Sequence, residues 1–213
     1  MSAQPGEKPR PPSYADSPPR LVGGHLALDF ANTLSSRNTA DRPKERLGDY
    51  RELILWASAA GLLSKAEARR LEREARARPA DAEAVVAFAR DLREALARLL
   101  TAPDKTRTGD LALVNEALAR APARDGLVAQ GKAYAWRLDA EGEPLERPLW
   151  PILWEGAALL TSEQRTRISA CRAEDCRWLF LDLSRNRSRR WCSMEDCGNR
   201  AKARRHYART RGS

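Results

Sequence analysis

The sequence CRAEDC at residues 171–176 and the sequence CSMEDC at residues 192–197 decide the fold of the carboxyl-terminal part of this 213-residue chain. Each holds two cysteines in the spacing Cys-x4-Cys, and the chain contains 4 cysteines in all. Two such pairs joined by a loop can place four thiolates at about 2.3 Å from one tetrahedral zinc ion. The alternative is four buried or redox-active thiols, which paired spacing in a reducing compartment does not favour. We predict a structural zinc ion, because four protein ligands leave no open position. Its ligands are Cys171, Cys176, Cys192 and Cys197.

The residues around the two pairs predict a small module. The apolar run WLFL at residues 178–181 is typical of a strand, and residues 167–169 could pair with it as a hairpin. Residues 198–211 lack proline and are rich in Ala and Arg, which predicts a helix capped by Ser193 and Asp196. A knuckle hairpin followed by a ligand in the first turn of a helix resembles the treble-clef arrangement. Because such a module buries a small apolar core, metal binding should supply much of its folding free energy.

The net charge of +9 lies entirely in the last quarter of the chain. Residues 165–213 contain 14 Lys and Arg against 5 Asp and Glu, while residues 1–164 contain 24 of each sign. This asymmetry indicates a polyanionic partner for one segment rather than a generally basic protein.

Nucleic acid is the polyanion that the arrangement of the basic residues favours. On the predicted helix, Asn199, Lys202 and Arg209 share one face, which suits a major groove, and the arginines between the two pairs could reach phosphates. DNA is favoured over RNA, since Trp178, Phe180 and Trp191 are expected in the core and few aromatics remain to stack on unpaired bases. The predicted contacts are Arg185, Arg187, Arg189, Arg190, Asn199, Arg200, Lys202, Arg204, Arg205 and Arg209.

Two other roles remain open for these charges. The basic residues could form a solvated surface, or they could dock on acidic side chains of the same protein. Within the loop, Asp182 lies among arginines and could accept hydrogen bonds from Arg189 or Arg190, which would make it local scaffolding.

The rest of the chain divides into two regions. Residues 1–20 are rich in proline and polar residues, which predicts a disordered tail. Residues 21–160 predict a mainly helical α+β domain with one small hairpin, whose strand at residues 134–138 would pair with a return strand starting near Leu145. The longest helix should start at Asp81, directly after Pro79 ends the helix before it.

Asp29 and Asn32 are the candidate ligand-binding residues of this domain. They lie three positions apart beside apolar residues, so on a helix they would share a face and could fix a small polar effector. The alternative is that they cap helices or join strands.

The sequence contains no motif that predicts catalysis. We find no Gly-rich phosphate loop, no metal-type His pair and no activated nucleophile, so we predict no enzyme activity.

Composition also excludes membrane proteins. No run approaches the roughly 18 apolar residues that a transmembrane helix needs, and the proline-rich start has no apolar run typical of a secretory signal. We expect a cytoplasmic protein without a membrane partner.

The motif CGNR at residues 197–200, preceded by RRWC at residues 189–192, resembles the CGNR zinc finger family over about residues 165–211. The upstream sequence LDFANTL at residues 28–34 and a Trp-rich segment near residue 150 are similar to the ABATE domain of stress-induced transcription regulators. This resemblance implies a transcription regulator with a DNA-binding zinc module behind a ligand-sensing domain. The alternative is a small-molecule-binding or protein-binding protein whose zinc module is a structural or docking element.

Overall fold

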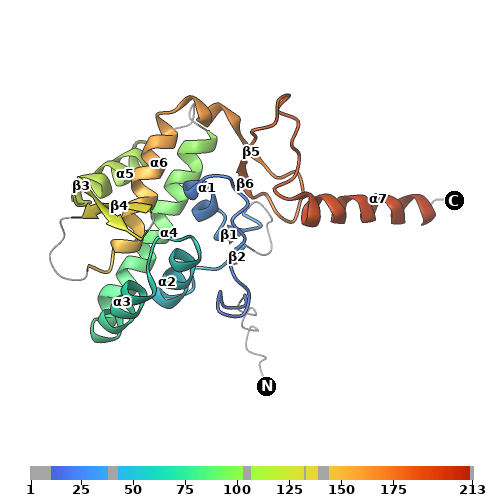
Figure 1. Ribbon diagram of the computed structural model, residues 1–213. Coiled ribbons are helices and arrows are strands. Elements are labelled where there is room, and N and C mark those ends of the chain that lie inside the picture. The colour runs from blue at the N-terminus through green and yellow to red at the C-terminus, as the bar shows by residue number, and fades with distance from the viewer. Residues whose placement is uncertain (1–10, 38–42, 103–106, 132, 139–143, 212–213) are drawn as a thin grey trace, which may run out of the picture.

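A computed structural model describes residues 11–37, 43–102, 107–131, 133–138 and 144–211. A helical body over residues 26–160 carries a smaller cysteine module, residues 168–211, on one side (Figure 1). The predicted α+β fold class is confirmed: helices dominate, the described strands form small antiparallel pairs, and four clustered cysteines lie in the second module. Within the described ranges, none of the helices combines the length and apolar character needed to cross a bilayer.

The body contains α1 (Leu26–Ala31), α2 (Tyr50–Ala59), α3 (Lys65–Ala77), α4 (Pro79–Thr101), α5 (Thr108–Arg120) and α6 (Trp150–Leu160). Its strands are β1 (Leu34–Ser35), paired with β2 (Lys44–Glu45), and β3 (Arg124–Gln130), paired with β4 (Ala133–Leu138). Single 3-10 turns cover Arg147–Leu149 and Glu163–Arg167. The cysteine module contains β5 (Ile168–Ala170), paired with β6 (Leu179–Leu181), a π-helical turn (Met194–Gly198) and α7 (Asn199–Arg211).

The long helix α4 forms the centre of the body. Its apolar residues recur every three or four positions, so one continuous stripe is buried, and the five other body helices pack around it. Helix α6 comes so close that a Cβ atom on Gly156 would lie 3.0 Å from Leu96 Cδ2. Helix α4 begins at Pro79 rather than at Asp81 as predicted, because proline fits the first turn of a helix, where its missing N–H has no intrahelical partner.

The hairpin of the body differs from the prediction. The strand at residues 134–138 exists as β4, but the return strand near Leu145 is wrong, because β4 pairs with β3, which precedes it in the chain. Gly131 takes the left-handed φ of +63° in the connecting turn, a conformation that glycine adopts without strain. Leu145 is instead buried and leads into a 3-10 turn.

The segment predicted to be a disordered tail packs in part on the body. Residues 1–10 lie outside the described residues, whereas Tyr14 is buried and its N–H donates to Glu52 Oε2 at 2.8 Å. Ser13 donates to the other carboxylate oxygen at 2.6 Å, and the Arg46 guanidinium lies 4.1 Å from the centre of the Tyr14 ring. The proline-rich composition predicted disorder for the whole segment and therefore missed the packing of Tyr14 on the body.

Strand β6 joins the cysteine module to the body. Leu179 and Leu181 are buried in the apolar core of the body, although they belong to the module. Phe180, between them in the sequence, points to the other side and packs with the four cysteines in a separate core. This alternation of side chains along a strand lets one short segment serve both cores.

Candidate metal centre

The first cysteine pair lies in the turn of the β5–β6 hairpin. Cys171 directly follows β5, and its N–H donates to the Trp178 carbonyl at 2.8 Å, which closes the turn. The N–H of Cys176 donates to the Ala173 carbonyl at 3.1 Å. Arg177 then adopts a left-handed φ of +60°, which returns the chain into β6. Both sulfur atoms therefore face the same side of the hairpin end.

The second pair is held by the loop after β6 and by the start of α7. The N–H of Arg172 donates to the Arg190 carbonyl at 3.0 Å, so the two knuckles lie beside each other. Cys197 lies in the π-helical turn that continues into α7. Ser193 makes no side-chain cap there, so the capping expected from Ser193 and Asp196 does not form. Instead, Arg20 donates to Asp196 at 2.6 Å and to Ser193 at 3.3 Å.

The four sulfur atoms converge as a tetrahedral zinc site requires. All four lie within 4.8 Å of one another, and Cys192 Sγ lies 3.6 Å from both Cys176 Sγ and Cys197 Sγ. Four sulfurs at about 2.3 Å from one zinc ion would be separated by about 3.8 Å. The observed separations are far beyond the roughly 2.05 Å of a disulfide bond, and all four thiols are free and buried.

The electrostatics of the cluster also fit a divalent cation. Hydrogen bonds from the thiols of Cys176 and Cys192 lower the pKa of Cys171, while the hydrogen bond with the Cys171 sulfur raises the pKa of Cys192. Four thiolates this close repel one another unless a cation lies among them. Arg200 contributes a partial counter-charge, because its Nη2 donates to Cys197 Sγ at 3.2 Å. The donor set therefore fits zinc held by four sulfurs, which would leave no open position for catalysis.

Asp182 and Arg189 hold the loop that delivers the second pair. Asp182 is 1% exposed and accepts hydrogen bonds from the N–H groups of Ser184 (2.9 Å) and Arg189 (3.0 Å), which confirms that it is local scaffolding. The Ser184 hydroxyl also donates to Asp182 and lowers the pKa of its carboxyl group. The Arg189 guanidinium lies 4.3 Å from the centre of the Phe180 ring.

The structure gives Arg189 a different role from the predicted nucleic-acid contact. Its guanidinium donates to the carbonyls of Trp191 (3.0 Å), Cys192 (2.5 Å) and Val22 (3.1 Å). With these bonds and the Phe180 ring, the side chain is committed to the module and to the segment before α1. The Arg189 guanidinium therefore holds segments of this chain together.

The other predicted nucleic-acid residues are exposed, but their charges are not equally available. Asp175 accepts from Arg204 at 3.0 Å and from Arg200 at 3.4 Å, so both arginines are partly neutralised. Asn199 donates to the Glu195 carbonyl at 3.1 Å. Exposed side chains without an acidic partner within the described part of the chain are Arg185, Arg187, Arg190, Lys202 and Arg205.

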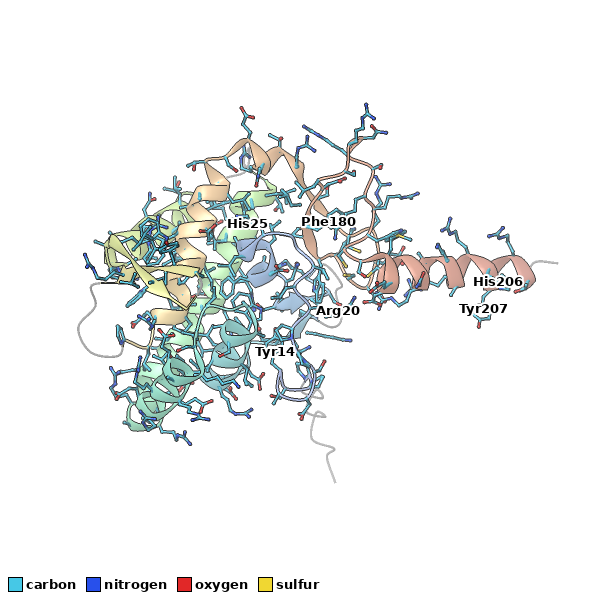
Figure 2. The ribbon with its side chains drawn as sticks, viewed as in Figure 1. Tyr14, Arg20, His25, Phe180, His206 and Tyr207 are labelled. Atoms are coloured by element: carbon cyan, nitrogen blue, oxygen red, sulfur yellow. The ribbon has the colours of Figure 1, made fainter. Side chains whose placement is uncertain are left out.

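The basic helix α7 projects from the body. In Figure 1 it extends outward from the cysteine module with the C-terminus at its far end, and Figure 2 shows His206 and Tyr207 near that end. Its 13 residues span about 20 Å. At its base, Arg172, Arg190, Arg200, Arg204 and Arg205 line a cleft of about 350 Å³.

Asp29 and Asn32 are brought to the junction between the body and the module. The Asn32 amide donates to the Leu179 carbonyl at 2.9 Å, and its oxygen accepts from the Leu179 N–H at 2.7 Å. Asp29 accepts from the Gly23 N–H at 2.7 Å, and burial raises the pKa of its carboxyl group to about 6. These bonds match the structural alternative, in which both residues join segments of the chain.

Sequence reasoning missed a buried ion-pair network beside this junction. Arg93 is 2% exposed and donates to both carboxylate oxygens of Glu45 at 2.7 Å, and also to Glu94 at 3.0 Å. Glu94 in turn accepts from Arg37 at 3.0 Å. The sequence feature that could have indicated this network is Arg93 itself, an arginine directly after Leu92 in the apolar stripe of the helix.

The fold and the sulfur cluster define a protein with a small zinc module packed on a helical body. A family model described as "CGNR zinc finger" matches residues 167–210, and a family model described as "ABATE: Putative stress-induced transcription regulator" matches residues 24–163. Because the second match covers more than half of the sequence, the chain belongs to the ABATE family. Both resemblances predicted from the sequence are confirmed. The zinc-finger match and the sulfur cluster together support a structural zinc ion. No curated protein matches the chain.

Proposed function

We propose that this protein is a transcription regulator that binds duplex DNA through the cysteine module and senses a small molecule through the helical body. The family match supports regulation and a zinc finger. The observation that carries the DNA-binding step is the composition of the projecting helix α7. Residues Asn199–Arg211 include six Lys and Arg and no acidic residue.

A polyanion would stabilise such a helix further. It has no apolar face, so packing on the body cannot stabilise it, and isolated helices shorter than about 12–15 residues are marginal in water. Its like charges lie one turn apart and repel one another. Duplex DNA would remove this repulsion, and a single helix fits the major groove.

The basic cleft at the base of α7 supplies the second part of the proposed interface. Arg172 and Arg190 come from the two knuckles, and Arg205 comes from α7, so one phosphate backbone could contact three segments of the chain. Asp175 holds Arg200 and Arg204 at the cleft wall. We therefore assign the main phosphate contacts to Arg172, Arg190, Lys202, Arg205 and Arg209, with Arg185 and Arg187 on the loop.

The alternative, in which the zinc module is only a docking or structural element, predicts a basic helix covered by the body. The side chains of residues 202–210 are instead exposed. This observation supports the DNA-binding proposal over the alternative.

The test is a fluorescence anisotropy titration of a labelled DNA duplex at several salt concentrations. The affinity should fall steeply with salt, with a slope on logarithmic axes of about 0.9 for each phosphate contacted. The variant Lys202→Ala/Arg205→Ala/Arg209→Ala should bind more weakly and show a slope that is lower by up to about 2.7. The variant Arg69→Ala/Arg70→Ala/Arg73→Ala is the control, because it removes the same charge from exposed positions of α3.

Two results would contradict the proposal. In the first, the affinity for the duplex is independent of salt. In the second, the α7 variant behaves like the α3 control. Tighter binding to single-stranded RNA of the same sequence would assign the interface to RNA instead.

A further inference from the structure

A small cavity of about 80 Å³ lies where three parts of the chain meet. Asp29 of α1, Asn32 directly after α1, and Arg46 line it from the helical body, while Trp178 lines it from the cysteine module. The segment before α1 covers it from a third side. Figure 2 shows this segment running from Tyr14, beside the body, to Arg20, near the start of α7.

Two nitrogen atoms of the lining residues have no partner. Arg46 Nε and Trp178 Nε1 are both buried, and neither forms a hydrogen bond with any residue that the structure describes. The Arg46 guanidinium donates a hydrogen bond to the Ser17 carbonyl at 2.8 Å and stacks on Tyr14, and it forms no salt bridge with any described residue. Buried donors are rarely left without an acceptor, because they lose their bonds to water.

The charge and size of the cavity define what could satisfy these donors. Both orphan groups are donors and one is cationic, so the missing group is an acceptor with negative charge. Asp29 is the acid among the lining residues, and the N–H of Gly23 already binds its Oδ1. The volume corresponds to about three waters at roughly 30 Å³ each, which is the size of a carboxylate with one or two carbon atoms.

We propose that this cavity binds a small carboxylate, whose oxygens accept from Arg46 Nε and Trp178 Nε1. Because Arg46 belongs to the body and Trp178 to the cysteine module, the bound anion stabilises the packing of one on the other. The proposed binding of the anion is argued from the cavity alone. An effect of the bound anion on the affinity for DNA would in addition rest on the proposed function.

The experiment uses the full-length, zinc-loaded protein labelled with ¹⁵N and acetate as the probe. Sodium acetate is titrated against sodium chloride of equal ionic strength, and the indole N–H signals of the six tryptophans are followed by NMR. The variant Trp178→Phe identifies the Trp178 signal and keeps an aromatic ring in place. We expect that signal to move saturably with acetate and not with chloride, while the signal of Trp136 on the distant hairpin stays in place.

The variant Arg46→Met removes the donor and keeps the side-chain stem. It should weaken acetate binding by roughly tenfold or more, as expected for the loss of a hydrogen bond to a charged group. Arg51→Met is the control, because Arg51 is exposed and lies outside the cavity. A Trp178 signal that does not move, or equal affinities of the two variants, would mean a cavity that holds water only and would overturn the proposal.

The proposals of carboxylate binding and of DNA binding are tested independently of each other. Acetate binding is measured without DNA, so a negative result leaves the anisotropy titration of the duplex unaffected. Loss of salt-dependent DNA binding would equally leave the acetate titration intact.

Discussion

Replacing Asn32 with alanine tests how the cysteine module is held on the helical body. The amide of Asn32 makes two buried hydrogen bonds to the backbone of Leu179, one as donor (2.9 Å) and one as acceptor (2.7 Å). In Asn32→Ala, both backbone groups of Leu179 stay buried without a partner. Each such group costs about 1–3 kcal/mol, so opening the junction should become about 2–6 kcal/mol easier.

Hydrogen exchange at Leu181 measures this opening. The Leu181 N–H donates to the Gly23 carbonyl across the junction at 2.8 Å, and this bond survives the substitution. A loss of about 2 kcal/mol corresponds to roughly thirtyfold faster exchange, the lower bound that we expect. Asn199→Ala is the control, since it removes an exposed asparagine with one bond to the Glu195 carbonyl. If exchange at Leu181 is equal in the two variants, the Asn32 bonds do not hold the junction.

Three further predictions follow from the metal centre, the buried ion pairs and Asp29. Cys176→Ser should lose one equivalent of zinc by metal analysis and much of the α7 helicity by circular dichroism, because the module core is too small to fold alone; a fully folded, metal-free module would contradict this. Arg93→Met should lower the free energy of unfolding in urea by about 3 kcal/mol, since the partly buried carboxylate of Glu45 loses both hydrogen bonds from Arg93 and keeps the more distant Arg90 at 3.9 Å, whereas Arg73→Met on the surface should change it by less than about 0.5 kcal/mol. The pKa of Asp29 is raised from 3.8 to about 6, so its stabilising contribution is complete below pH 3.8 and is lost as the pH rises through 6. The unfolding free energy of the wild type relative to Asp29→Asn should therefore fall by about 2 kcal/mol between pH 4 and 7, and an unchanged difference would refute the burial argument.

The sequence predicted the metal centre well because its signal is local. Two cysteines at a fixed short spacing can converge whatever the rest of the chain does, and the strand and helix signals beside them are equally local. The capping box of Ser64 and Glu67 and the cap at Asp49 were predictable for the same reason. In each case the residues that form the feature lie within a few positions of one another.

Roles that depend on distant segments could not be predicted. Arg189 has the same sequence neighbourhood as Arg187, yet it binds the carbonyl of Val22, 167 positions away, while Arg187 is exposed. Asn32 bonds to Leu179, which is 147 positions away, so the choice between a ligand-binding and a joining role stayed open in the sequence. Trp178 was expected in the core, and the position of its indole nitrogen at the junction cavity depends on how the body meets the module.

The same junction places the proposed carboxylate site next to the proposed DNA interface. Trp178 lies two residues after Cys176, whose sulfur belongs to the same cluster as the sulfur of Cys197 at the base of α7. A ligand on Trp178 and Arg46 would therefore act on the part of the chain that sets the direction of α7 relative to the body. It can change DNA affinity only if DNA and ligand prefer different arrangements of the body and the module, because a ligand shifts an equilibrium by its differential affinity alone. Comparing acetate affinity with and without bound duplex measures that difference directly, since coupling between two sites is reciprocal.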